Sequence, residues 1–362
     1  MYDNFYTKYE DAKIFINSVT AEYVIKMLEK EKHLTAEQCA YLSKAYVFFD
    51  DHKKAVKYAK KSVKLNPGYA YGYVRLAFAL GRQGKKKECL KNIELAEQFG
   101  RDDWFIQAFL ACVYNYTGNL EKSEYYLSKL LENQVNSPDY FYNVGFAYYA
   151  IIPEKYEKAV EYFEKAKDYK DKYNLYYKMM ESFAESDNID KALEYLEKCL
   201  AIQETQALLE RQIQCLIYLE RYDEAEDLSR KLYRKTDDKQ QVLRFLALTS
   251  KSRGLYNKAL RYLRFAYYTT DPTEYLYELA GEIYEAEKDY YAALDFYKKA
   301  LKFDKYDDDI LLNISYCYSM IKDYELADKY ADMAIMINDK TYGDLTPDSV
   351  REIIKRYIRE DV

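Results

Sequence analysis

The sequence predicts an all-α protein, built as a solenoid of antiparallel helix pairs. Small residues recur about every 34 positions, the apolar residues around them follow helical spacing, and glycine and proline are scarce. The chain has 362 residues but only 10 glycines and 5 prolines. Since β-turns and flexible linkers depend on these two residue types, neither an all-β protein nor a protein divided by linkers is expected.

A recurring small residue, usually alanine, marks the second helix of each predicted pair. The positions that follow it form one helix face, as in Ala293, Tyr297 and Ala300. The small residue recurs at steps of 33 to 36 residues, at Ala55, Cys89, Ser123, Ala159, Ala192, Ala225, Ala259, Ala293 and Ala327. A sustained period of this length predicts stacked repeats rather than independent domains.

A first helix precedes each of these second helices. It carries a large apolar residue, then a small one and, three positions on, often a tyrosine, as in Leu42-Ser43-x2-Tyr46, Leu110-Ala111-x2-Tyr114, Val144-Gly145-x2-Tyr148, Ala280-Gly281-x2-Tyr284 and Ile314-Ser315-x2-Tyr318. A small residue lets two helices approach closely, while the large residues beside it fill the gap. Each repeat is therefore predicted to be one packed helix pair.

Glycine and proline mark the ends of the predicted helices. Gly84, Gly118 and Gly254 occupy the same place between the two helices of their pairs, where a left-handed backbone conformation is easiest for glycine. All five prolines fall at predicted helix boundaries. None lies in a helix interior, where a proline costs about 3 kcal/mol.

The whole pattern resembles the tetratricopeptide repeat (TPR). Nine copies in phase span residues 36–341, and a weaker copy precedes them. The resemblance implies a right-handed superhelix in which first helices line the concave side and second helices the convex side. The copies depart from the family pattern at Cys39 and Gln107, and most clearly in the sixth copy, at Gln212 and Ser229.

Three regions are predicted along the chain. Residues 1–35 form a degenerate N-terminal repeat or cap, residues 36–341 form the TPR array, and residues 342–362 form a C-terminal capping helix. Thr346 and Pro347 give that last helix an N-cap followed by proline at its first position. The caps are expected because a terminal repeat exposes the apolar face that inner repeats bury.

Few residues point to catalysis. The sequence has no nucleotide-binding loop, zinc-protease motif or serine-hydrolase motif, and His33 and His52 lack partners for a triad or a metal set. Residues 307–309 are three aspartates, interpreted as capping a helix rather than binding a cation. We therefore expect a non-enzymatic protein with no cofactor and no metal.

The composition indicates a cytoplasmic protein. The six cysteines form no CxxC pair and are interpreted as reduced, packed thiols. No apolar stretch is long enough to span a membrane, and Met1-Tyr2-Asp3-Asn4-Phe5 does not begin a secretory signal. The net charge of −6 is too balanced for a generally basic nucleic-acid binder.

The family geometry predicts which first-helix residues face the concave groove. Carried onto this sequence, the candidate partner-binding residues are Tyr71, Val74, Phe78, Phe105, Asn115, Tyr142, Phe146, Tyr149, Tyr177, Glu181 and Arg244. Two interpretations remain open: these side chains are packed between closely wound helices, or they form a platform for an extended segment or helix of another protein. A clamp of Lys44, Asn143 and Lys178 for a C-terminal carboxylate is not expected, because these residues lie far apart in repeat number.

We expect a protein-interaction scaffold, and two other functions remain as alternatives. One is a regulatory receptor for a signalling peptide. The other is association with nucleic acid through a lysine stripe on one second helix and the start of the next, formed by Lys53, Lys54, Lys57, Lys60, Lys61, Lys64, Lys85, Lys86, Lys87 and Lys91. The bland interpretation of this stripe is a solvated convex face. The identity of the partner, the pathway and the oligomeric state stay open.

Overall fold

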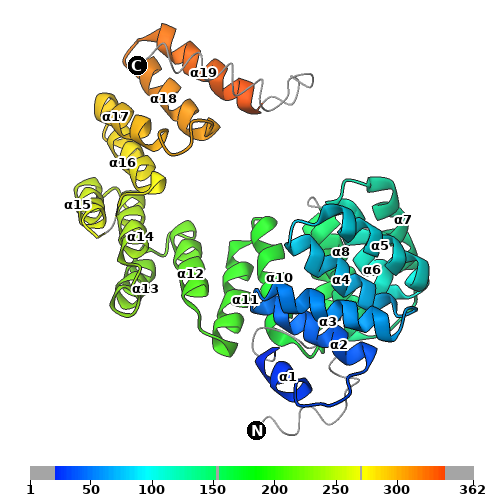
Figure 1. Cartoon of the computed structure of the whole chain (residues 1–362). Coiled ribbons are helices and arrows are strands. Elements are labelled where there is room, and N and C mark those ends of the chain that lie inside the picture. The colour runs from blue at the N-terminus through cyan, green and yellow to red at the C-terminus, as the bar shows by residue number, and fades with distance from the viewer. Residues whose placement is uncertain (1–20, 152–154, 270, 339–362) are drawn as a thin grey trace. The chain divides into compact units, whose positions relative to one another are not determined.

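The described residues form helices only. The computed structural model describes residues 21–151, 155–269 and 271–338, and these ranges hold nineteen helices (Figure 1). The first, α1 (Ala21–Leu28), lies within the predicted N-terminal repeat. The predicted C-terminal capping helix and the first twenty residues lie outside the described residues.

Within the described ranges nine helix pairs follow α1, and in each pair the two helices pack against each other. The first helices are α2 (Ala36–Phe48), α4 (Ala70–Arg82), α6 (Trp104–Tyr116), α8 (Pro138–Ile151), α10 (Lys172–Glu185), α12 (Gln206–Tyr218), α14 (Lys239–Ser252), α16 (Glu274–Ala286) and α18 (Asp308–Met320). The second helices are α3 (His52–Leu65), α5 (Lys86–Gly100), α7 (Leu120–Glu132), α9 (Tyr156–Lys165), α11 (Ile189–Ile202), α13 (Tyr222–Lys235), α15 (Tyr256–Tyr267), α17 (Tyr290–Ala300) and α19 (Tyr324–Asn338). The predicted all-α solenoid of helix pairs is confirmed.

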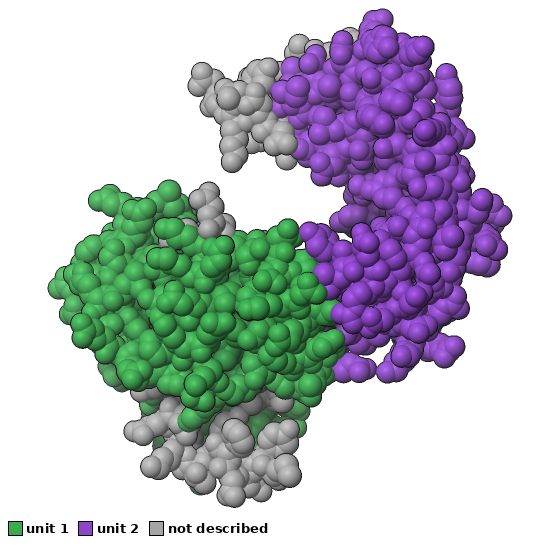
Figure 2. All heavy atoms as spheres, turned by 180° about the vertical axis from the view of Figure 1, so that it is seen from behind, with its two compact units in different colours: residues 1–203 green, residues 204–362 purple. Residues whose placement is uncertain are grey.

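The chain divides into two compact units. Unit 1 comprises residues 1–203 and unit 2 comprises residues 204–362 (Figure 2). The division falls just before α12, the first helix of the sixth pair. This pair departs most from the repeat pattern, with Gln212 and Ser229 at positions where other pairs carry large apolar or aromatic residues. The predicted boundaries of the array at 36 and 341 stay a prediction.

Close approach of the helices depends on the small residue of the first helix. A β-carbon on Gly145 of α8 would lie 2.8 Å from two ring carbons of Phe163 in α9. A β-carbon on Gly281 of α16 would lie 2.6 Å from two ring carbons of Tyr297 in α17. Both rings are fully buried. The aromatic residue of the second helix therefore fills the space that the glycine leaves open.

In eight of the nine pairs the turn between the two helices contains one residue in the left-handed conformation; the turn between α8 and α9 lies largely outside the described residues. Gly84, Gly118 and Gly254 have φ between 71° and 82°, as predicted from their common position. In other pairs the same turn holds a non-glycine residue with φ between 52° and 67°, namely Asp50, Asp187, Glu220, Lys288 and Lys322. Packing of the two helices thus imposes this backbone conformation even where the residue disfavours it.

The abundance of tyrosine has a structural explanation. In several pairs, the tyrosine or phenylalanine near the end of the first helix stacks on an aromatic ring near the middle of the second, with ring centres 5.3 to 6.0 Å apart. These stacked pairs are Tyr46–Tyr58, Tyr114–Tyr126, Tyr148–Tyr162, Phe183–Tyr195, Tyr284–Phe296 and Tyr318–Tyr330. Offset ring stacks add stabilisation beyond the area that they bury.

Buried or half-buried glutamates join successive pairs in both units. In unit 1, Glu97 of α5 pairs with Lys122 of α7 at 2.8 Å and accepts hydrogen bonds from the hydroxyls of Tyr114 and Tyr126. These contacts tie the second helix of one pair to both helices of the next. Together they lower the pKa of Glu97, although burial alone acts to raise it.

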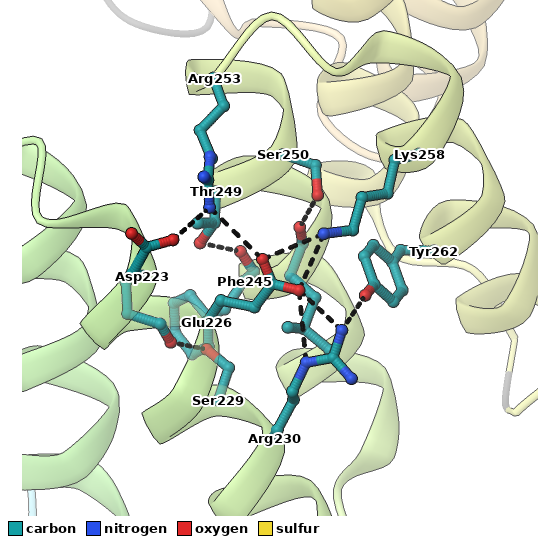
Figure 3. A network of polar contacts seen from close by, with 12 residues as sticks. Asp223, Glu226, Ser229, Arg230, Phe245, Thr249, Ser250, Arg253, Lys258 and Tyr262 are labelled. Atoms are coloured by element: carbon teal, nitrogen blue, oxygen red, sulfur yellow. Dashed lines mark hydrogen bonds and ion pairs between the residues drawn. The ribbon is translucent and has the colours of Figure 1, made fainter.

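Unit 2 contains a similar network around Glu226 of α13 (Figure 3). Its carboxylate pairs with Arg230 of the same helix at 2.7 Å and with Lys258 of α15 at 2.8 Å. Arg253, at the end of α14, lies 3.7 Å from Glu226 and 2.8 Å from Asp223. One carboxylate with a 14% exposed side chain therefore joins α13 to the two helices of the following pair.

Candidate functional site

All but one of the predicted groove residues lie on consecutive first helices of unit 1. Tyr71, Val74 and Phe78 are on α4, Phe105 and Asn115 are on α6, Tyr142, Phe146 and Tyr149 are on α8, and Tyr177 and Glu181 are on α10. Neighbouring first helices also pack against each other along this series. Arg244 lies on α14 and belongs to unit 2.

These residues differ widely in how much surface they offer. Val74 is 3% exposed and Tyr71 is 9% exposed, so both form wall rather than contact surface. Phe78 is 41% exposed, and the remaining predicted residues are half-buried. The guanidinium groups of Arg75 and Arg82 lie 5.2 and 5.8 Å from the centre of the Phe78 ring.

Side chains of the chain itself cover part of the aromatic series on α8. The ammonium group of Lys178 lies 4.5 Å from the ring centre of Tyr149 and 5.5 Å from that of Phe146. Lys178 also pairs with Glu181 at 2.7 Å. The ring of Tyr142 stacks on Tyr169, with ring centres 4.2 Å apart. Part of the ring surface that the sequence offers to a partner is therefore already in contact.

Two cationic side chains lie inside unit 1. Arg75 is 9% exposed, and within the described residues its Nε has no hydrogen-bond partner. Burial lowers its pKa, against the opposing effect of the Tyr71 hydroxyl to which Arg75 is hydrogen-bonded. Burial and the nearby Arg75 lower the pKa of Lys44 to about 7, while Asp171 acts in the opposite direction. The surroundings of Arg75 and Lys44 thus disfavour the charged forms of these two side chains.

A pocket lies where the second and third helix pairs meet. It has a volume of about 400 Å³ and is lined by Gly68, Tyr69, Ala70, Tyr71, Phe99, Gly100, Asp103, Trp104, Phe105 and Ile106. These residues come from the segments leading into α4 and α6, from the helices themselves and from the end of α5. Two of the predicted groove residues, Tyr71 and Phe105, meet in this pocket, edge to face, with ring centres 5.5 Å apart.

The sequence pattern did not identify the other pocket residues. Tyr69, Asp103 and Trp104 lie at or just before the first residue of a first helix, outside the positions that recur between repeats. The ring of Trp104 meets Phe105 and Tyr140 edge to face. The one available signal was composition, because Trp104 is the only tryptophan of the chain.

One carboxylate lines this pocket and a second acts on one of its tyrosines. Asp103 caps α6, and its Oδ1 accepts a hydrogen bond from the backbone N–H of Phe105 at 2.8 Å. Glu37, in the first turn of α2, accepts a hydrogen bond from the hydroxyl of Tyr41 at 2.6 Å. Burial raises the pKa of Tyr69, and the negative charges of Glu37 and Asp103 raise it further. The pocket therefore combines aromatic walls with a carboxylate.

Unit 2 presents a different first-helix face. The Arg244 guanidinium lies 5.2 Å from the ring centre of Phe245 and 5.5 Å from that of Tyr275, and burial lowers the pKa of Arg244. Glu278, on α16, has its pKa raised by burial and by Glu282 and other nearby carboxylates. Carboxylates therefore repel one another on this part of α16.

The part of the chain that the structure describes contains no group of three or more side chains arranged to hold a metal ion. None of its helices has the length and apolar character needed to cross a membrane. Asp307 caps α18 by accepting from the N–H of Ile310 at 2.9 Å, as the interpretation of the three aspartates predicted.

Comparison with known proteins supports the repeat assignment. The family model described as tetratricopeptide repeat matches residues 39–69 and 274–307. These two segments fall within the first and the eighth helix pairs. No curated protein sequence matches the chain.

Solved structures share the fold at low sequence identity. The human IFIT1 dimer with m7Gppp-AAAA is 14% identical in sequence, with a TM-score of 0.51. The match covers 89% of this chain and 77% of the IFIT1 chain. The same dimer with PPP-AAAA is 15% identical, with a TM-score of 0.50, and the match covers 89% of this chain and 78% of the IFIT1 chain. A tetratricopeptide repeat protein from Parabacteroides merdae ATCC 43184 is 17% identical with a TM-score of 0.40, and covers 83% and 99%.

The matched segments agree in phase with the helix pairs of the structure. Each match begins in a first helix, and the match at 274–307 continues through the second helix of its pair. The paired helices and their recurring small residues have the organisation of tetratricopeptide repeats, and the family model matches two segments of the chain, residues 39–69 and 274–307.

Proposed function

We propose that the chain is a non-enzymatic, cytoplasmic scaffold that holds a segment of another protein against the first-helix face of unit 1. Tetratricopeptide repeats support protein interaction in general. The observation that carries the finer proposal is the aromatic pocket at Tyr71 and Phe105, since it joins two first helices of the predicted groove. Concave, mostly apolar pockets with a few polar groups are the usual form of a binding site.

The predicted residues take different parts in this proposal. Phe78, Phe105 and Phe146 supply aromatic surface to the partner, because they are exposed or half-buried. Tyr71 and Val74 form the wall behind them. Asn115 donates through Nδ2 to the carbonyl of Ala150 at 3.2 Å, which fixes α6 against α8. The proposed platform is therefore held by contacts that exist without the partner.

Selection from a displayed library of random peptides tests the proposal. We expect peptides that bind the full chain and lose about ten-fold in affinity when Phe105 is replaced by alanine, as happens at aromatic interface anchors. The matched control is Tyr125→Ala, which removes an exposed aromatic ring from α7, a second helix of the same unit. Circular dichroism would verify that both variants stay helical. Equal loss of binding in both variants, or none in either, would refute the proposal.

Two alternatives remain beside it. A signalling-peptide receptor would use the same face, but would require the free terminus of a short peptide. Nucleic-acid association would use the lysine stripe on α3 and the start of α5, where all ten side chains are exposed. The IFIT1 structures that share the fold contain PPP-AAAA and m7Gppp-AAAA. Binding of RNA that weakens steeply between low and physiological salt, and is lost when the stripe is neutralised, would favour this alternative.

A further inference from the structure

We propose that the pocket formed by Tyr69, Asp103 and Trp104 receives the side chain of an arginine in the bound segment. This inference rests on the proposed function and names the side chain that the scaffold recognises. It follows from three properties of the pocket: its aromatic lining, its single charged wall residue and the charge around its mouth.

The lining favours a flat cation. Five of the ten lining residues are aromatic, namely Tyr69, Tyr71, Phe99, Trp104 and Phe105. Aromatic rings attract cations through the negative potential of their faces, and tryptophan does so most strongly. A neutral apolar side chain would also fill such a pocket. The charged groups around the pocket must therefore decide between a cationic and a neutral side chain.

The charges favour a cation over a neutral group. Among the described residues that line the pocket, Asp103 is the only charged one. One of its carboxylate oxygens accepts the capping bond from Phe105, and no described residue forms an ion pair with this carboxylate. The helix α6 places a partial positive charge of about one half at its N-terminus. The full negative charge of Asp103 exceeds that half charge, while Glu37 beyond Tyr69 and Arg75 beside Tyr71 carry opposite charges.

Arginine fits this combination better than lysine. Its guanidinium is planar and weakly hydrated, so it can stack against a ring and leave water at a lower desolvation penalty than a compact ammonium group. It can also donate two parallel hydrogen bonds to one carboxylate. In Asp103 one oxygen is occupied by the helix cap and the other remains as an acceptor. The expected contact is therefore one charge-assisted hydrogen bond together with stacking.

A fluorine label on the single tryptophan gives a direct test. Full-length protein containing 5-fluorotryptophan has one protein 19F resonance, at Trp104, because the chain has no other tryptophan. The probes are N-acetyl-arginine amide and N-acetyl-citrulline amide, which have nearly the same shape but differ in charge. We expect the arginine amide to shift the resonance saturably and to bind about five-fold more tightly than the citrulline amide.

A pair of matched variants separates charge from structure. Asp103→Asn keeps a side-chain oxygen that can cap α6 but removes the negative charge. Asp238→Asn makes the same change at the N-cap of α14 in unit 2. We expect Asp103→Asn to reduce the preference for arginine to less than about two-fold and Asp238→Asn to leave it unchanged.

Three outcomes would overturn the inference. They are equal affinity of the wild-type protein for the two amides, no shift with either amide, and retention of the full preference in Asp103→Asn. Failure here is distinct from failure of the proposed function. Library peptides that require Phe105 but contain no arginine would leave the scaffold proposal standing and exclude the arginine pocket. An arginine preference at Trp104 without any Phe105-dependent peptide would leave the arginine pocket standing and exclude the scaffold proposal.

Discussion

Gly281 lies directly against the ring of Tyr297, so that a β-carbon on Gly281 would stand 2.6 Å from the ring atoms Cδ1 and Cε1. Tyr297 is 1% exposed and has no space in which to move away. We therefore expect Gly281→Ala to lower the free energy of unfolding by about 1 to 3 kcal/mol through overpacking. Urea unfolding followed by circular dichroism would measure it.

The control for this prediction is the same substitution at Gly81. This glycine also lies in a first helix, α4, but its nearest neighbour to an added β-carbon is Cys89 Sγ at 3.6 Å. Because alanine is the better helix former and has room, Gly81→Ala should stabilise the protein by about 0.5 to 1 kcal/mol. If the two substitutions shift stability in the same direction, the close-packing explanation fails.

The left-handed turn residues give a second pair of opposite expectations. Lys288 has φ of 63° and Gly254 has φ of 72° at the same position of successive pairs. Lys288→Gly relieves the strain on a residue with a β-carbon, so it should raise the unfolding free energy by about 1 kcal/mol. Gly254→Ala should lower it by a similar amount. Chemical denaturation of the two variants side by side would check both signs, and a destabilising Lys288→Gly would argue against strain.

Lys44 should make stability depend on pH in the alkaline range. Burial and Arg75 lower its pKa to about 7 in the folded protein, whereas an unfolded lysine titrates near 10.4. Between these values the unfolded chain binds a proton that the folded chain does not, so stability rises with pH. Lys44→Met should remove this rise and stabilise the protein at pH 7 by about 1 to 2 kcal/mol.

Unfolding curves of both proteins at about pH 7 and pH 9 would test this expectation, because these values bracket most of the lysine titration while tyrosines stay protonated. The unfolding free energy of wild type should rise relative to that of the Met variant as the pH is raised from about 7 to about 9. A relative rise as the pH is lowered would show that the predicted sign is wrong. Parallel pH profiles would show that Lys44 does not carry the effect.

Glu226 should make stability rise with pH in the acidic range, with the same sign as Lys44 has in the alkaline range. Burial acts to raise its pKa, but hydrogen bonds and charges from Lys258 and Arg230 outweigh burial and lower it. Its contribution to stability is thus present above the ordinary glutamate pKa and is lost as the pH falls through the lowered value. Glu226→Gln should destabilise the protein by about 1 to 2 kcal/mol at pH 7.

The difference between Glu226→Gln and wild type should shrink toward zero in acid, where the glutamate is protonated in both states. Thermal unfolding at pH 7 and at about pH 3 would measure it. The control is Glu224→Gln, since Glu224 forms an ion pair with Arg221 at an exposed site of the same helix. Equal effects of the two variants would contradict a special role for the network in Figure 3.

The helix pairs were predictable because each repeat packs against the repeats before and after it in the same way, so the same positions need the same residue types. The recurrence of Ala259 and Ala293 located the second helices, and the glycines at 84, 118 and 254 located the left-handed turns. The same turn geometry at Lys288 was not predictable from residue type. A local preference is overridden there because the packing of two helices leaves the connecting residue only one conformation.

The candidate site was predictable only in part. Helical phase grouped Tyr71 with Phe105, and their rings meet in one pocket, but it could not give their exposure. Exposure depends on side chains outside the pattern, such as Lys178, which lies over Tyr149. Asp103 is the N-cap of α6. An aspartate at this position predicts a helix cap, and nothing in the sequence marks it as a binding residue.

Distance along the repeats was also a poor guide to distance in space. Lys44 belongs to the first helix pair and Asp171 caps the first helix of the fifth, yet the carboxylate of Asp171 raises the pKa of Lys44. An electrostatic effect of this kind requires the two groups to lie near each other. That Lys44, Asn143 and Lys178 form no carboxylate clamp stays a prediction.

Photocrosslinking tests the proposed binding face most directly. Benzoylphenylalanine would replace Phe78 on the first-helix face of α4 or, in a separate protein, Tyr125 on α7, two aromatic residues that are both exposed. A library-selected peptide should crosslink at position 78 and not at position 125. A crosslink at 125 alone, or equal yields at both positions, would contradict binding on the first-helix face.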